Sequence, residues 1–325
     1  MFILLGGTVF LIFSIAISIL FGAADINLQT IWQSITNFDS NSTSHQIIIG
    51  LRIPRALAAA LIGAALAVSG SLMQGMTRNP LASPSIMGVT AGATFMMAIA
   101  LIVMPHASNF VMMLWAFAGA GLGVAIVFGV GSISKSGLTP VKLALAGTAV
   151  SAILSSLSSA IAIHFNVAKD MSFWYAGGVS SVQWLHVQLL WPIVVIGLIL
   201  AFILAKSITV LALGDNVAKS LGQHTLLIKT VGTIVVLLLT GAAVSVSGTI
   251  GFIGLVIPHI TRFLVGVDYR WIVPCSAVLG GLLLVIADTV SRMVNPPFET
   301  PVGTITALVG VPFFLYLARR EGGKM

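Results

Sequence analysis

The chain has 325 residues, of which 58% are hydrophobic and only 7% are charged, whereas about 25% of the residues of an ordinary soluble domain are charged. A chain this apolar cannot hide its surface in water, so its solvent must be lipid. Every backbone amide in lipid needs an internal partner, which leaves only helices or a closed barrel. The apolar runs are continuous and about 20 residues long, without the alternation of barrel strands. The sequence therefore predicts an all-α polytopic membrane protein.

The net charge of +7 does not indicate a nucleic-acid-binding protein, because the basic residues are scattered singly at the ends of apolar runs. The single cysteine, Cys275, lies inside an apolar run, which excludes a disulfide framework and predicts a packing role.

Apolar runs between polar breaks predict ten transmembrane helices in a single permease domain over residues 1–325. The first run could also be a signal peptide, but it has no Lys or Arg before it and many runs follow it, so we interpret it as a span. The predicted spans are 2–21, 53–74, 82–104, 109–133, 141–164, 187–206, 226–247, 251–266, 271–293 and 301–319.

The distribution of basic residues predicts the orientation of these ten spans in the membrane. An even number of spans puts both termini on one side, and if that side is the cytoplasm, eleven basic residues are cytoplasmic and four are outside. This positive-inside bias supports both the orientation and the count of ten. The cytoplasmic residues are Arg78, Lys135, Lys142, Lys206, Lys219, Lys229, Arg262, Arg270, Arg319, Arg320 and Lys324, and the outer ones are Arg52, Arg55, Lys169 and Arg292.

One cytoplasmic segment, about 208–224, is predicted to form a short amphipathic helix. Leu211, Leu213, Val217 and Leu221 recur on one side, with polar residues between them. Periodicity alone leaves open whether this face lies on lipid or against a partner protein.

Two similar ten-residue segments, called here the internal echo, indicate an inverted repeat. GAALAVSGSL at 63–72 and GAAVSVSGTI at 241–250 are identical at six of ten positions. The copies lie five spans apart, so they cross the membrane in opposite directions, as the repeats of transport folds do. The alternative is that small-residue packing motifs recur by chance.

No catalytic motif, nucleotide-binding loop or pair of histidines at metal-ligand spacing is present in the sequence, so it predicts no enzyme, no cofactor and no metal site. Asp288 is the only acid well inside a span. Such an acid can be an ion relay, which keeps an ion-coupled secondary transporter as an alternative. Arg292 follows one helical turn later, however, and a local ion pair is the interpretation that we favour.

Ser151, Ser155 and Ser159 recur at four-residue intervals in the fifth span. Such small residues pack helices closely, which is the interpretation that we favour, and a mildly polar wall along a passage is the alternative.

Three long segments resemble the FecCD/BtuC class of permease subunits of binding-protein-dependent ABC importers. They are LRIPRALAAALIGAALAVSGSLMQGMTRNPLASPSIMGVTAGA (51–93), SGTIGFIGLVIPHITRFLVG (247–266) and ADTVSRMVNPPFETPVGTITALVGVPFFLYL (287–317). The resemblance implies a BtuC-like fold with ten spans, cytoplasmic termini and two permease subunits around one passage. It also implies three partners: an ATP-binding subunit, an extracytoplasmic substrate-binding protein, and a second permease subunit, identical or related.

The resemblance also implies roles for individual residues. LGDNVAKSLG (213–222) is similar to the family's coupling helices, so Leu213, Gly214, Ala218, Leu221 and Gly222 are expected to contact the ATPase. The fifth span lines the family's passage, which favours a pathway role for its serines. Arg52, Arg55 and Arg292 occupy the positions of arginines that dock the binding protein.

The cargo implied is an iron chelate. The opening FGAADINLQTIW is similar to ferric-hydroxamate permeases, while haem and cobalamin stay as alternatives within the same fold. The expected location is the bacterial cytoplasmic membrane.

Overall fold

The computed structural model describes residues 2–22, 26–132, 140–295 and 298–322. Lys135 and Lys324, which the orientation argument counts as cytoplasmic, lie outside the described residues. The regular elements of the described residues are all helical. They are α1 (Phe2–Leu20), α2 (Leu28–Thr36), α3 (Thr43–Ile47), the π-helix η1 (Ile48–Arg52), α4 (Ile53–Thr77), the 3₁₀ helix η2 (Pro84–Met87), α5 (Val89–Val103), α6 (Asn109–Ser132), α7 (Pro140–His164), α8 (Ala168–Ala176), α9 (Trp184–Ala212), α10 (Asp215–Ser220), α11 (Thr225–Ser247), α12 (Ile253–Val265), α13 (Tyr269–Met293) and α14 (Val302–Gly322).

Seven helical segments in the described part of the chain are long and apolar enough to cross a membrane. They lie in α1, the continuous run α3–η1–α4, α6, α7, α9, α11 and α13. Three shorter apolar helices, Val89–Val103, Ile253–Val265 and Val302–Leu317, fall on the third, eighth and tenth predicted spans. The chain is therefore an all-α membrane protein, as the sequence predicts.

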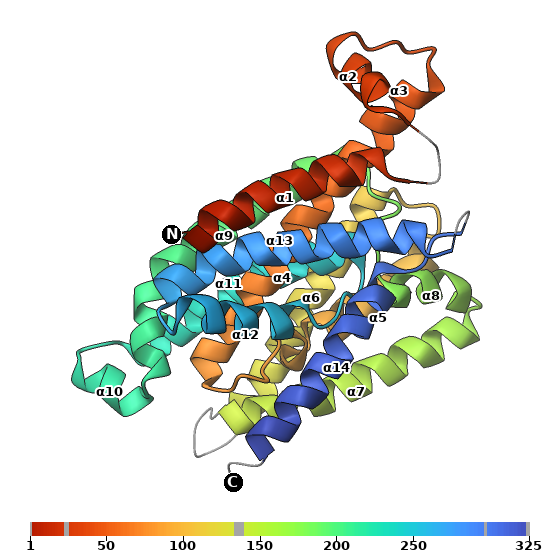
Figure 1. Ribbon diagram of the computed structural model, residues 1–325. Helices are drawn as coiled ribbons and strands as arrows, with labels where there is room; N and C mark the ends of the chain where they lie inside the picture. Colours follow the sequence, from red (N-terminus) through yellow and green to blue (C-terminus); the bar gives the residue numbers. More distant parts are fainter. Residues whose placement is uncertain (1, 23–25, 133–139, 296–297, 323–325) are drawn as a thin grey trace.

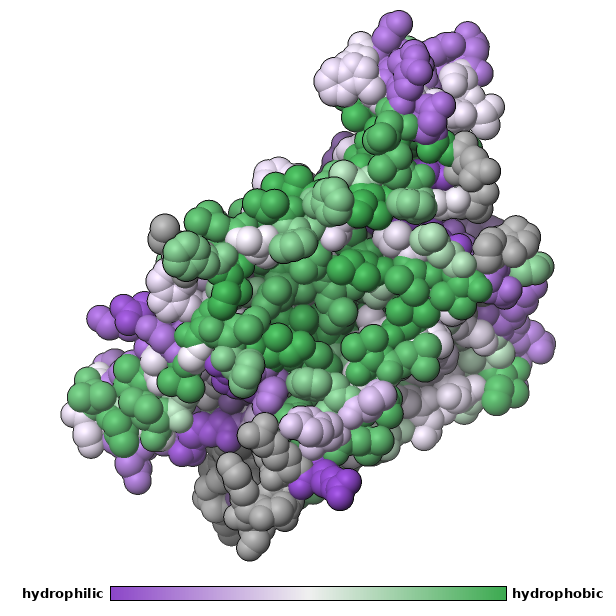
Figure 2. Space-filling model, in the orientation of Figure 1, coloured by the Kyte–Doolittle hydropathy of each residue, from purple (hydrophilic) through white to green (hydrophobic). Residues whose placement is uncertain are grey.

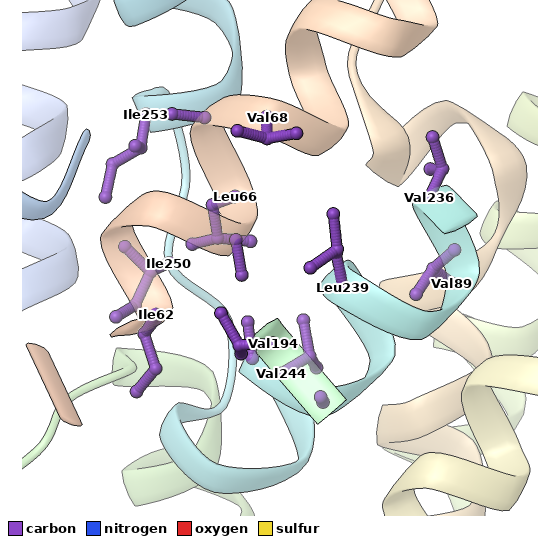
Figure 3. Close-up of a cluster of buried hydrophobic side chains, with 14 of the residues drawn as sticks. Ile62, Leu66, Val68, Val89, Val194, Val236, Leu239, Val244, Ile250 and Ile253 are labelled. Carbon is purple, nitrogen blue, oxygen red and sulfur yellow. The ribbon is translucent and has the colours of Figure 1, made fainter. Parts of the chain in front are cut away.

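Helix α4 forms the centre of the bundle and is buried along nearly its whole length. Small residues allow neighbouring backbones to approach it: Gly63 lies against Gly280 of α13, and Gly70 against Gly254 of α12. Figure 3 shows Ile62, Leu66 and Val68 of α4 within a cluster of branched side chains from α5, α9, α11 and α12. Close packing around small residues is the main attraction between helices in lipid.

A short chain of hydroxyl groups ties α4 to α12 and α13. Ser71 Oγ donates to Ser276 Oγ at 3.0 Å, and Ser276 Oγ donates to Thr261 Oγ1 at 3.2 Å. Interhelical hydrogen bonds of this kind contribute about 0.6 kcal/mol each in membrane proteins. Cys275, next to Ser276, is free and buried, as its predicted packing role requires.

The two copies of the internal echo lie in α4 and α11, which contact each other, but they have different secondary structure at their ends. The first copy stays helical beyond Leu72, whereas the second leaves the helix after Ser247. Gly248 follows with φ +64°, where an added Cβ would meet the backbone of Trp174. The aligned glycines Gly70 and Gly248 thus serve helix packing in the first copy and a turn in the second.

Figure 1 shows the long helices crossing the molecule between two ends. One end, called here the α10 end, carries α10 and the C-terminus, and the other, the α8 end, carries α8 and the projecting pair α2–α3. Figure 2 shows a broad apolar face between hydrophilic surfaces at the two ends. This distribution is the one that a bilayer requires.

Candidate functional site

A cluster of buried charges joins α4 to α13 at the α8 end. Arg55 donates from Nη2 and Nε to Asp288 at 2.8 and 2.9 Å, and from Nη1 to Glu299 at 2.7 Å. Asp288 is fully buried, whereas the side chain of Glu299 is 42% exposed. Arg55 thus links a buried acid in a helix to an accessible acid in the segment before α14.

Two further arginines of this cluster hold the end of α1. Arg292 pairs with Asp288 at 3.1 Å and donates to Ser18 Oγ at 2.6 Å and to the carbonyl of Phe21 at 3.1 Å. Arg52 donates from Nη1 to the carbonyls of Ile19 and Leu20 at 2.8 and 2.7 Å. Cations at a helix carboxyl end satisfy its free carbonyls and its dipole.

The predicted pair Asp288–Arg292 is confirmed. The sequence did not reveal that Arg55 also binds Asp288 and that Glu299 binds Arg55. Arg52, Arg55 and Arg292 all lie at the same end of the molecule, and each is more than 90% buried. The available signal was an excess of arginines and two acids, Asp288 and Glu299, near one predicted surface. Which arginine meets which acid depends on helix packing that the sequence does not show.

A cavity of about 520 Å³ opens beside the charge cluster. Arg55 and Glu299 form one wall, and Asp170 and Trp174 of α8 together with His186 of α9 contribute others. His186 accepts a hydrogen bond at Nδ1 from the backbone N–H of Gln183, which closes a capping box at the start of α9. Because Asp288 and Glu299 already neutralise Arg55, this cavity has a polar wall without a strong anion-binding charge.

At the α10 end, the predicted surface helix is shorter than expected. The segment 208–212 is the last part of α9, and the separate helix spans only Asp215–Ser220, so the expected bounds of 208–224 are wrong. Leu211 is fully buried, because it still packs in the bundle. Gly214 allows the break, since its φ of +133° is a conformation that favours glycine.

The expected coupling residues lie on and beside this helix. Leu213, Val217 and Leu221 are exposed and form an apolar surface, while Ala218 is fully buried on the opposite side. Gly222 is exposed with φ +77°, and nothing lies near the place of an added Cβ. Lys229 of α11 fixes the start of α10 through a 2.7 Å ion pair with Asp215.

The neighbouring turn before α13 is held by Asp268. Its carboxylate accepts from the side chain and backbone N–H of Arg270, which holds its pKa below the usual value. Asp268 thereby caps α13.

Helix α7 places the three predicted pathway serines on a loosely covered side. Ser155 and Ser159 are exposed, and Ser151 is half-buried with an Oγ that has no hydrogen-bond partner among the described residues. Ser158, one position away from Ser159, is fully buried, and its Oγ donates to the carbonyl of Leu154 at 2.7 Å. Helix α7 therefore carries a buried serine, Ser158, next to the exposed serines of the predicted series.

The chain matches the FecCD transport family over residues 10–320. It is 61% identical over 319 residues to the iron(3+)-hydroxamate import system permease protein FhuB of Bacillus subtilis, covering 98% of this chain and 83% of that protein. It is 36% identical to the hemin transport system permease protein HmuU of Yersinia pestis, covering 92% of this chain and 90% of that protein. A solved structure described as an inward-facing conformation of a putative metal-chelate type ABC transporter superposes with a TM-score of 0.86 at 28% identity, covering 98% and 99% of the two chains.

These similarities extend over nearly the whole chain and include the segments that carry the arginine cluster, α7 and α10. They also argue against the alternative of an ion-coupled secondary transporter, because the chain matches the FecCD transport family. Asp288, the acid on which that alternative depended, is paired with Arg55 and Arg292. The chain belongs to the FecCD transport family and is a permease subunit of an ABC import system.

Proposed function

We propose that this permease carries ferric hydroxamate chelates across the bacterial cytoplasmic membrane, driven by a separate ATP-binding subunit and supplied by an extracytoplasmic binding protein. The observation that carries the proposal is the 61% identity, over 98% of the chain, to a permease of iron(3+)-hydroxamate import. Relatives named for other cargoes are less similar: 49% for an iron-uptake permease, 45% for an Fe(3+)-citrate permease and 36% for a hemin permease.

The proposal includes a ten-span arrangement in one domain over residues 1–325, with an inverted repeat and both termini in the cytoplasm. Seven long spans and three shorter apolar helices in the described part of the chain support the number ten. The excess of basic residues on the side of α10 supports its cytoplasmic position. The α10 end is then cytoplasmic, and the α8 end faces outward.

We infer that the ATPase contacts the surface formed by Leu213, Val217 and Leu221, with Gly214, Ala218 and Gly222 shaping it. Three exposed apolar side chains around a six-residue helix favour a protein groove over water. The buried Ala218 and the Lys229–Asp215 ion pair hold α10 on the bundle. A force on α10 would therefore be transmitted to α9 and α11.

We infer that a second permease subunit, identical or related, packs on the side of α7 and α14. Both helices expose large apolar residues: Leu145, Ile153, Leu157 and Ile163 on α7, and Leu308, Val309, Leu315 and Tyr316 on α14. Figure 1 shows the two helices on the same side of the molecule. The exposed Ser155 and Ser159 would then line a passage between two subunits, together with Ser151.

We further propose that the arginine cluster docks the binding protein. Arg55 is the best placed of the three, because its Nη1 faces the accessible Glu299 and the outer cavity. Arg292 and Arg52 support this position through the end of α1. A carboxylate of the binding protein would have to replace Glu299 at Nη1 of Arg55, and would then form the charge-assisted contact to which a guanidinium is well suited.

Transport by the purified assembly tests the cargo. The permease is reconstituted in vesicles with its ATPase and binding protein, and ATP-dependent uptake of ⁵⁵Fe is compared for a hydroxamate chelate, ferric citrate, a catecholate chelate and haem. We expect uptake of the hydroxamate chelate and slower or no uptake of the others. Equal uptake of citrate, or uptake of haem alone, would contradict the assignment.

A further inference from the structure

Helix α2 presents an apolar face that nothing in the described structure covers. Leu28, Ile31, Trp32 and Ile35 follow the i, i+3, i+4, i+7 spacing of one helix face. Leu28, Trp32 and Ile35 are 69%, 67% and 59% exposed. The remaining positions of the helix are Gln, Thr or Ser, and none is charged.

The segment around α2 is held by its own contacts. Asn27 caps α2 by accepting from the N–H of Thr30 at 2.8 Å, and Ser42 caps α3. The backbone N–H of Asp39 donates to Nδ1 of the buried His45 at 3.1 Å, which closes the turn between the helices. The apolar face of α2 is therefore fixed on a folded hairpin.

The chain fixes the level of this hairpin relative to the bilayer. It follows closely on α1, a spanning helix, and leads through α3 and η1 into the spanning helix α4. Arg52 at the end of η1 binds the last carbonyls of α1, so both helices cross the same membrane boundary there. Helix α2 contacts α3 and η1, which lie just outside this boundary, so it lies at the level of the headgroups.

The hairpin also lies on the lipid side of the molecule. Figure 1 shows it projecting beyond the end of α1, away from α7 and α14. Helix α1 exposes Phe10, Ile12 and Phe13 along its length, and these face lipid in a spanning helix. Helix α2 follows this lipid-facing helix in the chain, just beyond its end.

We propose that α2 is an interfacial helix that lies in the headgroup region beside α1, with Leu28, Ile31, Trp32 and Ile35 inserted toward the acyl chains. Trp is the residue most typical of this depth. An interfacial helix inserts its apolar face about 5–10 Å into the boundary of headgroups and acyl chains. Because α2 has no charged residue, its insertion depends on apolar area alone, and neither anionic lipid nor salt should change it.

Spin labels on the two faces of α2 test the proposal in the full-length protein. In a Cys275→Ala background, a nitroxide is attached at Ile35→Cys on the apolar face or at Gln33→Cys on the polar face, both of which are exposed positions. The protein is reconstituted in phosphatidylcholine vesicles, with and without phosphatidylglycerol. The accessibility of each label to oxygen, which concentrates in the acyl region, and to a water-soluble nickel complex is then measured.

We expect the label at 35 to be accessible to oxygen and shielded from nickel, the label at 33 to show the reverse, and both results to be independent of lipid charge. Quenching by brominated lipid gives a second readout without a label: the wild type should lose more fluorescence than Trp32→Phe. Equal nickel accessibility of both labels overturns the proposal. Shielding of the label at 35 that appears only when the binding protein is added also overturns it, and assigns the face to that protein.

Discussion

Asp288 balances a larger charge than a single buried acid usually does. Arg55 and Arg292 both bind it, and Arg52 lies at the same helix end. Three arginines and two acids, counting Glu299, leave one excess positive charge (3 − 2 = 1). The free carbonyls at the end of α1 carry the compensating partial negative charge, since they accept from Arg52 and Arg292. The ends of α1, α4 and α13 at the α8 end of the molecule thus form one electrostatic unit.

Replacing Asp288 should destabilise the protein much more than replacing Glu299. Asp288→Asn leaves the buried Arg292 without a carboxylate and leaves Arg55 with only the partly exposed Glu299, and breaking a buried pair this way typically costs about 3–5 kcal/mol. Glu299→Gln removes a partly exposed partner, for which about 1 kcal/mol or less is expected. Thermal midpoints of the two variants in detergent, followed by fluorescence size-exclusion, measure the difference. Equal midpoints would show that Asp288 does not hold the cluster together.

Glu299 also allows a test of docking that leaves the core intact. Its carboxylate occupies Nη1 of Arg55, so a carboxylate from the binding protein would have to replace it. We therefore expect Glu299→Gln to raise the affinity for the binding protein, and Arg55→Gln to lower it by about tenfold, which is about 1.4 kcal/mol. Affinities are measured at low and high salt, because an exposed charge contact is screened over about 8 Å at physiological salt. Unchanged affinity in both variants would remove Arg55 from the docking surface.

At the scale of elements, the burial of individual residues in α10 and α7 decides which substitutions can test a contact without disturbing the fold. Ala218 is fully buried and Gly222 has a positive φ, so substitutions there disturb the fold of α10 as well as any contact. Leu213 and Leu221 are exposed, and changes to them act on the contact alone. In α7 the buried Ser158 lies among exposed serines and serves as an internal reference.

Exposed leucines beside α10 should be needed for coupling. Leu213→Asp and Leu221→Asp place a charge in the proposed apolar contact, and we expect loss of the ATP hydrolysis that the binding protein stimulates. Ser220→Asp adds the same charge at an exposed polar position and should retain most of the stimulation. Membrane insertion and expression should be normal in all three. Full stimulation in both leucine variants would mean that the ATPase contacts another surface.

Cysteines in α7 should report the passage. In a Cys275→Ala background, Ser155→Cys and Ser159→Cys should react with a polar thiol reagent in one nucleotide state and be protected in another. Ser151→Cys should react more slowly, because that side chain is half-buried, and Ser158→Cys should not react in any state. If the labels at 155 and 159 stay unreactive throughout, these serines face lipid or pack against a helix.

Across the whole molecule, the sequence predicts what depends on the bilayer and misses what depends on helix packing. Each of the ten predicted runs contains an apolar helix, and seven helical segments of the described residues are long enough to cross a membrane, because the thickness of the membrane sets the length of an apolar run. The three arginines share one end, as their positions in the chain indicate. Glu299 as a partner of Arg55, and the burial of Leu211, arise from contacts between distant segments. The exposed face of α2 was present in the sequence pattern, but its importance emerges only from its place beside α1.

The central helix α4 contains glycines that allow close contact with the backbones of neighbouring helices. An added Cβ at Gly70 would overlap the backbone of Gly254 in α12, and backbone atoms cannot move aside as a flexible side chain can. Overpacking of a core typically costs about 1–3 kcal/mol, even where side chains can shift, so Gly70→Ala should separate α4 from α12 and abolish the folded protein. Gly121→Ala in α6 is the matched control, because nothing lies within contact distance of its added methyl group. The yield of monodisperse protein in detergent should fall sharply for Gly70→Ala and stay at the wild-type level for Gly121→Ala. A stable Gly70→Ala protein would mean that α4 and α12 are farther apart than the contact of Gly70 with Gly254 requires.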